Sequence, residues 1–185
     1  MIDFGYGVIL HSLDRGHLPK LRAWRNDARI WRWCRQHDVI SEAHQERWFE
    51  HQSDAPALRM YTVRVRKPVE TFGEEETVVG VAGLTSIDWV NRRAEFSLYI
   101  APEYQGNGYG EMGLKTLLAH GFRNLNLHSI WGETYEGNRA LEMFYALGFQ
   151  FEGTRREHYF RNGRYIDAHL VSLLAREFEA KWGSP

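Results

Sequence analysis

Apolar residues recur along the chain at two spacings, one typical of strands and one typical of helices. Between Leu58 and Arg66, apolar and basic residues alternate, as in a strand with one face in solvent. The Asn162-Gly163 pair predicts a tight hairpin turn between two long strands. In chain order, the pattern predicts a strand over 8–13, helices over 18–28 and 41–52, strands over 58–66, 77–90 and 94–100, a helix over 110–125, a strand over 129–134, a helix over 138–147 and a hairpin over 149–174.

This order of elements predicts a mixed sheet with interleaved helices, folded as a single domain over residues 1–185. The segment 68–76 contains Pro68, Gly73 and three consecutive glutamates, which predicts an exposed loop. With 185 residues, of which 43% are apolar, the chain can bury a core without disulfides or a structural metal.

Composition narrows the function classes. The formal net charge of -1 provides no overall basic field, so nucleic acid is not an expected partner. The single cysteine, Cys34, cannot form an internal disulfide, and the chain start lacks the pattern of a secretory signal. No window reaches the roughly 18 apolar residues that a membrane span needs. We therefore expect a cytoplasmic protein without a membrane partner.

The most informative stretch runs from Tyr99 to Gly110, where a strand ends, a glycine-rich turn follows and an amphipathic helix begins. The glycines at 106, 108 and 110 let backbone N–H groups approach an anion, and the start of the helix adds unpaired N–H groups. The loop lacks the Gly-Lys-Ser/Thr ending of a nucleotide-triphosphatase loop. Two interpretations stay open on this loop alone: a phosphate site, or a tight turn between a strand and a helix.

The segment Gln105-Gly-Asn-Gly-Tyr-Gly110 resembles the Gln/Arg-x-x-Gly-x-Gly/Ala signature of the GNAT N-acetyltransferases. The segment from Asn138 to Phe149 is similar to the second signature of that family, and Trp24-Arg25-Asn26 resembles its ribosomal-protein and aminosugar-nucleotide branch. The resemblance implies an α/β (α+β) fold with a single mixed, mostly antiparallel sheet that is splayed between its fourth and fifth strands. It also implies acetyl-CoA as donor, a primary amine as acceptor and no metal.

The resemblance further implies that pantetheine bonds to the backbone of the fourth strand, along Leu98 to Ile100. A backbone N–H near Ile100 would then stabilise the oxyanion of the tetrahedral intermediate. The alternative is a strand amide that is simply bonded in the sheet. The residues implied in cofactor binding are Leu98, Ile100, Gln105, Gly106, Asn107, Gly108, Tyr109, Gly110 and Asn138.

Two residues are candidates for proton transfer. Strand alternation places Glu95 on the face opposite Phe96, and the resemblance implies that Glu95 accepts the proton of the amine. An ion pair with Arg92 or Arg93 is an equal alternative. The resemblance implies that Tyr145 protonates the departing thiolate, and the alternative is that Tyr145 belongs to the core. Since the amine can attack directly, no enzyme nucleophile is expected.

Basic residues near the start of the chain are candidates for acceptor binding. If the helix or helix pair in this region is continuous, the arginines at 22, 25, 29, 32 and 35 share one face. The candidate contacts are Arg25, Arg29, Trp31 and, in the final hairpin, Arg156. A solvated charged face is the alternative interpretation.

We expect the acceptor to be a protein N-terminus or a small amine such as an aminosugar nucleotide. Polyamines are disfavoured, because an arginine-rich edge repels cations. The alternatives are a CoA-binding sensor or partner domain without turnover, and, less favoured, a binder of nucleic acid. Apolar surfaces such as the final strand would permit a homodimer.

Overall fold

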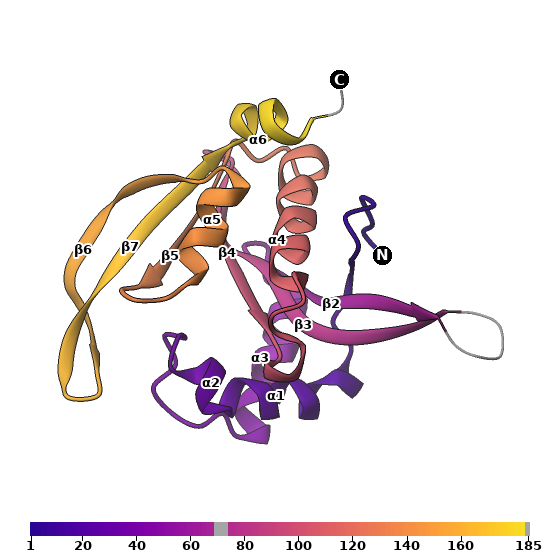
Figure 1. Cartoon of the computed structure of the whole chain (residues 1–185). Helices are drawn as coiled ribbons and strands as arrows, with labels where there is room; N and C mark the ends of the chain where they lie inside the picture. Colours follow the sequence, from indigo (N-terminus) through magenta and orange to yellow (C-terminus); the bar gives the residue numbers. More distant parts are fainter. Residues whose placement is uncertain (69–73, 184–185) are drawn as a thin grey trace.

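A computed structural model describes residues 1–68 and 74–183 of the chain (Figure 1). Its strands form one seven-stranded sheet in the order β1-β2-β3-β4-β5-β7-β6. The strands are β1 (Ile9–Ser12), β2 (Arg59–Pro68), β3 (Glu74–Asp88), β4 (Arg93–Ile100), β5 (Ser129–Tyr135), β6 (Gln150–Arg161) and β7 (Arg164–Leu174). Strands β4 and β5 pair in parallel, and the other neighbouring pairs of described strands are antiparallel. The sheet is therefore mixed and mostly antiparallel, as predicted.

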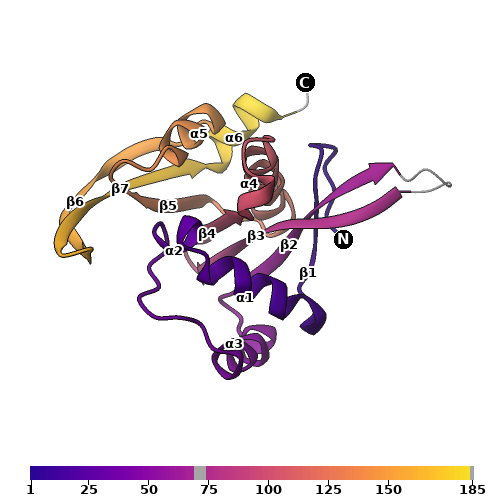
Figure 2. The ribbon, with the colours of Figure 1, turned by 60° about the horizontal axis from the view of Figure 1, so that its bottom comes forward.

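Helices cover both faces of the sheet (Figures 1 and 2). They are α1 (Leu18–Asn26), α2 (Ala28–Trp31), α3 (Glu42–Asp54), α4 (Tyr109–Ala119), α5 (Ala140–Leu147) and α6 (Ala175–Trp182), with short helical turns at Arg15–His17, Pro102–Tyr104 and His120–Asn124. Strand β4 packs against the helices on both faces of the sheet. Phe96 packs in the core under α4 and α5, whereas Tyr99 packs with Leu21 and Trp24 of α1. None of the described helices is long and apolar enough to cross a membrane.

The two central strands separate soon after they meet. Strand β4 pairs with β5 only from Arg93 to Glu95, so its later residues have β3 on one side and none of the described strands on the other. Gly132 of β5 lies where a Cβ would collide with the ring of Phe96, and glycine therefore leaves room for that ring at the start of the opening. The splay predicted between the fourth and fifth strands is present.

The N-terminal arginines do not lie on one continuous helix. Asp27 takes an extended conformation and its side chain accepts a hydrogen bond from the amide of Arg29, which starts α2 as a separate helix. Helix α2 ends at Trp31, so Arg35 lies in the connection to α3. The predicted common face is therefore wrong.

Both described ends of the segment predicted as a loop over 68–76 are strand instead. Glu74 begins β3, and Glu76 pairs across the strands with Arg66 of β2. Glu76 stands opposite Arg66 of β2, and this pair of opposite charges favours the strand over a loop. Residues 69–73 lie outside the described part of the chain. Helix α6, which the sequence pattern did not predict, closes the core with Phe178.

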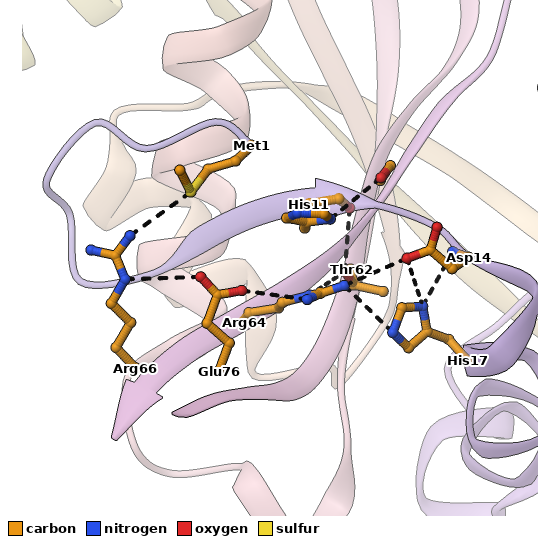
Figure 3. A network of polar contacts seen from close by, with 9 residues as sticks. Met1, His11, Asp14, His17, Thr62, Arg64, Arg66 and Glu76 are labelled. Atoms are coloured by element: carbon orange, nitrogen blue, oxygen red, sulfur yellow. Dashed lines mark hydrogen bonds and ion pairs between the residues drawn. The ribbon is translucent and has the colours of Figure 1, made fainter. Parts of the chain in front are cut away.

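A polar network fixes the corner between β1 and α1 (Figure 3). The guanidinium of Arg64 on β2 donates to Thr62 at 3.2 Å and to Glu76 at 3.4 Å, and lies 3.4 Å from Nε2 of His17. Asp14 adds a carboxylate 3.8 Å from Arg64. Because Asp14 and His17 immediately precede α1, this network holds the helix that borders the opening of the sheet.

Candidate active site

A cavity of about 720 Å³ opens where β4 and β5 separate. Its walls come from α1, α2 and the following connection, from both central strands, and from the start of α5. The lining residues with polar or charged side chains are Arg25, Arg29, Trp33, Cys34, Arg35, Thr85, Glu95, Ser97, Tyr99, Gln105, Glu133, Thr134, Asn138 and Arg139. Residues from four separate parts of the chain therefore meet at the splay of the sheet.

The edge of β4 presents free backbone groups to this cavity. The amide of Ala101 donates to the carbonyl of Val79 on β3, so antiparallel alternation directs the backbone groups of Leu98 and Ile100 away from β3 and toward the opening. The carbonyl of Ile100 accepts a hydrogen bond from Gln105 at 2.9 Å. Leu98, Ile100 and Gln105 all line the cavity, which suits an extended ligand bonded along β4.

The glycine-rich loop lies beside the cavity, at the start of α4. Gly106 and Gly108 have φ angles of 82° and 77°, which L side chains rarely adopt, and Gly108 is the residue that precedes the helix. Gly110 has no positive φ. The backbone amides of residues 106–111 donate no hydrogen bond to any described residue. Those amides, including those of Asn107 and Tyr109, are free to bind an anion at the positive end of α4.

Two buried carboxylates stand side by side at the point of separation. Glu95 on β4 and Glu133 on β5 have side chains that are 8% and 3% exposed, and the guanidinium of Arg35 bridges them. Arg155 on β6 adds a second cation 2.9 Å from Glu133, and the hydroxyl of Tyr159 donates to the same carboxylate. The alternative of an ion pair at Glu95 thus agrees with the structure in kind, but the partner is Arg35 instead of Arg92 or Arg93.

The pKa values of the groups around the carboxylates reflect this pairing. Burial alone would lower the pKa of Arg35, but the hydrogen bond and charge of Glu95 and the charge of Glu133 outweigh burial and raise it. Burial, followed by the hydrogen bond to Glu133, raises the pKa of Tyr159 to about 12. Arg35 is therefore a permanent cation between the carboxylates, and Tyr159 stays a neutral donor.

The aromatic residue of α5 that lines the cavity is Phe144, the neighbour of the predicted Tyr145. Phe144 of α5 lines the cavity and is buried, whereas Tyr145 is 43% exposed and contributes nothing to the lining. Consecutive helical residues point about 100° apart, so a shift of one position turns the phenol away from the opening. The geometry does not support Tyr145 as the proton donor to the thiolate.

The other predicted contacts divide between the cavity and the surface. Arg25 and Arg29 line the cavity, and Arg29 is paired with Asp27 at 2.6 Å. Trp31 and the exposed Arg156 are absent from the lining, so the structure does not bring these two to the site.

Asn138 lines the cavity, and its side-chain oxygen accepts a hydrogen bond from the amide of Ala140 at 3.0 Å. This bond starts α5 and leaves the side-chain NH₂ group of Asn138 as the donor available to a ligand.

Sequence patterns did not predict the hydrogen bonds that hold the acceptor side together. Arg161 at the end of β6 donates to the carbonyl of Gln36 at 2.8 Å and to the carbonyl of Cys34, and its guanidinium also donates to the hydroxyl of Tyr135 at 3.2 Å. Asn26 donates to the carbonyl of Ile40 at 2.9 Å. These bonds fix the connection 32–41 over the cavity. The alternation of β5 could have indicated Glu133, but no local signal indicates Arg161.

Comparison with known proteins identifies the fold. A family model described as an acetyltransferase (GNAT) domain matches residues 8–150. A spermidine N(1)-acetyltransferase of Vibrio cholerae is 28% identical over 172 residues, which are 92% of this chain and 95% of the relative. The crystal structure of spermidine N-acetyltransferase from that organism, in complex with CoA and spermine, superimposes with a TM-score of 0.85 at 27% identity, covering 93% of this chain and 98% of the other. A further structure of the Vibrio cholerae enzyme is dodecameric.

A second relative resembles a shorter part of the chain. The Bacillus subtilis protein YdaF, provisionally named as a ribosomal N-acetyltransferase, is 31% identical over 106 residues, which are 57% of this chain and 58% of the relative. The predicted family is thus confirmed, although the relatives that match nearly the whole chain are named for spermidine. Since the family model, the splayed sheet and the solved CoA complex agree, the chain belongs to the GNAT acetyltransferases and transfers an acetyl group from acetyl-CoA to a primary amine.

Proposed function

We propose that the acceptor is a small-molecule amine, which enters the cavity between β4 and β5 and attacks the thioester directly. The observation that carries this proposal is the cover over the acceptor side, where Arg161 holds the connection 32–41 through the carbonyls of Cys34 and Gln36. A covered cavity of about 720 Å³ suits a small ligand better than a folded protein terminus. The spermidine named for the Vibrio cholerae relative is one such small amine and belongs in the first panel of acceptors.

Acetyl-CoA binding is assigned to two backbone features. The free amides of residues 106–111 bind the pyrophosphate, with Gly106 and Gly108 providing the necessary turn. The outward backbone groups of Leu98 and Ile100 bind the pantetheine arm, and the amide of Ile100 stabilises the developing oxyanion. The NH₂ group of Asn138 is the side-chain donor to the same ligand.

Glu95 is assigned as the group that accepts the proton of the amine. A lysine-type amine has a pKa of about 10.4, so at neutral pH it must lose a proton before it attacks. Glu95 is the last residue of β4 that pairs with β5, which places its carboxylate at the start of the opening. Arg35 holds this carboxylate in place, and a water molecule between Glu95 and the amine can relay the proton.

The departing thiolate needs no acid from α5. Phe144 occupies the cavity-facing position of that helix and cannot donate a proton. A thiol with an ordinary pKa of about 8.5 is protonated readily by solvent at neutral pH. The proton taken from the amine is therefore returned to the thiolate through water.

We propose that the enzyme self-associates through the final hairpin. Strand β6 forms the edge of the sheet, and Phe151, Phe160 and Tyr165 of the hairpin are 53%, 54% and 63% exposed. A relative assembles as a dodecamer. Light scattering should give more than one copy for the wild type and a smaller particle for Phe160→Glu.

Thiol release from acetyl-CoA tests the proposed function. The wild type should acetylate at least one small amine in a panel that includes spermidine, and no peptide N-terminus at a comparable rate. Glu95→Gln should lower kcat by about a hundredfold, while calorimetry shows unchanged acetyl-CoA binding. Turnover of peptides alone would contradict the small-molecule assignment, and binding of acetyl-CoA without any turnover would leave a CoA-binding domain.

A further inference from the structure

A second cavity adjoins the first on the other side of β4. It measures about 460 Å³ and lies between α1, α3 and the sheet. Its apolar walls are Leu21, Ile40, Trp48, Leu58, Met60 and Val81. Arg25, Thr85, Ser97 and Tyr99 line both cavities, so the two spaces meet along β4. An acceptor can therefore keep its amine in the first cavity and place its body in the second.

Arg25 stands at this junction with part of its guanidinium free. Its Nε and Nη2 donate to Oε1 of Gln36 at 3.3 and 3.2 Å, and the group lies 5.6 Å from the ring centre of Tyr99. Its Nη1 donates to no described residue, and no described carboxylate forms an ion pair with Arg25. The arginines before and after it on the chain differ, since Arg22 is paired with Glu42 and Arg29 with Asp27.

The charges around both cavities disfavour a second ammonium group on the acceptor. In the first cavity, Glu95 and Glu133 are already neutralised by Arg35 and Arg155. Asp38 is the one carboxylate among the described residues that line the second cavity, and its formal charge is equal and opposite to that of Arg25 in the same lining. A polycation would thus meet no net negative charge, whereas an anion would meet the guanidinium of Arg25, whose Nη1 donates to no described residue.

We propose that the second cavity binds the body of the acceptor and that Arg25 binds an anionic group, a carboxylate or a phosphate, on the same molecule. This inference rests on the proposed function, because it names the class of small amine that the enzyme acetylates. The acceptor is then a primary amine joined through an apolar chain or ring to an anion.

Matched acceptors test this assignment by thiol release. Three series of increasing chain length carry the same primary amine and end in a carboxylate, a methyl group or a second amine, and phosphoethanolamine and spermidine complete the set. The carboxylate or phosphate acceptors should exceed the methyl series in kcat/KM by about tenfold or more, the effect of one hydrogen bond to a charged group. The better of the two anions identifies the group. Higher kcat/KM for the diamines or spermidine, or equal values in the carboxylate and methyl series, overturns the inference and leaves the proposed function standing.

Variants of Arg25 separate anion binding from a structural role. Arg25→Gln should raise KM for the best anionic acceptor by about tenfold to a hundredfold, with kcat and KM for the methyl-terminated amine nearly unchanged. Arg25→Lys should restore part of the affinity because it keeps the charge. Arg22→Gln is the matched control, since Arg22 lies on α1 but lines neither cavity.

If Arg25→Gln loses activity equally toward the anionic and the methyl-terminated acceptors, Arg25 has a structural role and the inference is overturned. If no acceptor in any series supports thiol release, the proposed function fails, and this inference fails with it.

Discussion

Phe144 and Tyr145 are neighbours on α5 that face different surroundings. The ring of Phe144 packs edge to face on Phe96, with 5.0 Å between the ring centres, at the wall of the cavity. The ring of Tyr145 is 43% exposed on another side of the helix. The aromatic pair of Phe96 and Phe144 therefore forms an apolar part of the cavity wall.

Tyr145→Phe should leave catalysis nearly unchanged. The phenol lies outside the cavity, so kcat for the best acceptor should stay within about twofold of the wild type, as for a surface substitution. Steady-state thiol release measures this. Phe144→Ala, in contrast, should lower the free energy of unfolding by about 3 kcal/mol or more because it empties a buried site. A large loss of kcat in Tyr145→Phe, with acetyl-CoA binding intact, would return the acid role to Tyr145.

Gly108 and Gly110 provide a matched pair for testing the phosphate loop. Gly108→Ala forces a side chain into a φ of 77°, which costs about 1–2 kcal/mol. The loop should relax away from this strain, and the Kd for acetyl-CoA should rise by about tenfold. At Gly110 an added Cβ would meet Met143 at 3.6 Å and Ile100 at 3.7 Å, which is ordinary contact. Gly110→Ala should therefore bind acetyl-CoA almost normally in calorimetry, and equal losses in both variants would argue against the loop geometry.

The carboxylate pair predicts a specific pattern of stabilities. Arg35→Gln leaves Glu95 and Glu133 facing each other without their shared cation and should lower the free energy of unfolding by about 2 kcal/mol. Adding Glu133→Gln to this variant should recover part of the loss, a coupling of about 1 kcal/mol. Denaturant unfolding of the wild type, the two single variants and the double variant measures this coupling. Arg93→Gln, which breaks an exposed ion pair with Asp88, should change stability by less than about 1 kcal/mol.

Most of the fold could be predicted from local patterns, and the glycine turn to which the proposed function assigns the donor is also a local signal. The alternation in β4, the glycine turn at 105–110 and the Asn162-Gly163 hairpin are local signals that need no knowledge of tertiary structure. The contacts of Arg35 and Arg161 could not be predicted, because their partners are distant in sequence: Arg35 contacts Glu95, and Arg161 contacts Cys34.

Tyr145 shows a different limit of sequence reasoning. A motif with two adjacent aromatic residues does not state which of them faces the site, and the packing of α5 on Phe96 decides in favour of Phe144. The acceptor-binding residue is equally hard to predict, because an arginine-rich segment does not show which guanidinium has no carboxylate as an ion-pair partner.

Protonation of His17 should lower the free energy of unfolding in mild acid. Burial and then the charge of Arg64 lower its pKa, and a nearby carboxylate on Asp14 offsets only part of this effect. The folded protein therefore holds fewer protons than the unfolded chain. The stabilisation is complete above the unfolded pKa of about 6.5 and is lost as pH falls toward the lower folded value. Thermal unfolding between pH 7.5 and 5 should show this decline, and His17→Gln should flatten it; an unchanged slope would contradict the assignment.

Substitution of Arg161 should raise the KM for the acceptor amine and leave the affinity for acetyl-CoA unchanged. Its guanidinium joins the end of β6 to the carbonyls of Cys34 and Gln36, and the connection between α2 and α3 thereby closes over the cavity. Arg161→Lys keeps the charge but cannot form this fork of hydrogen bonds. Trypsin should then cleave the freed connection at Arg35 faster than in the wild type, and KM for the amine should rise by about tenfold.

The control for this experiment lies in the same hairpin. Arg164 is exposed, and no side-chain hydrogen bond or ion pair joins it to the described residues, so Arg164→Lys should match the wild type in proteolysis and in KM. Calorimetric affinity for acetyl-CoA should be equal in all three proteins, because the loop at 105–110 and the edge of β4 do not contact Arg161. A parallel loss of acetyl-CoA affinity in Arg161→Lys would mean that the hairpin supports the whole site, and a normal KM with faster cleavage would show that the connection can open without weakening acceptor binding.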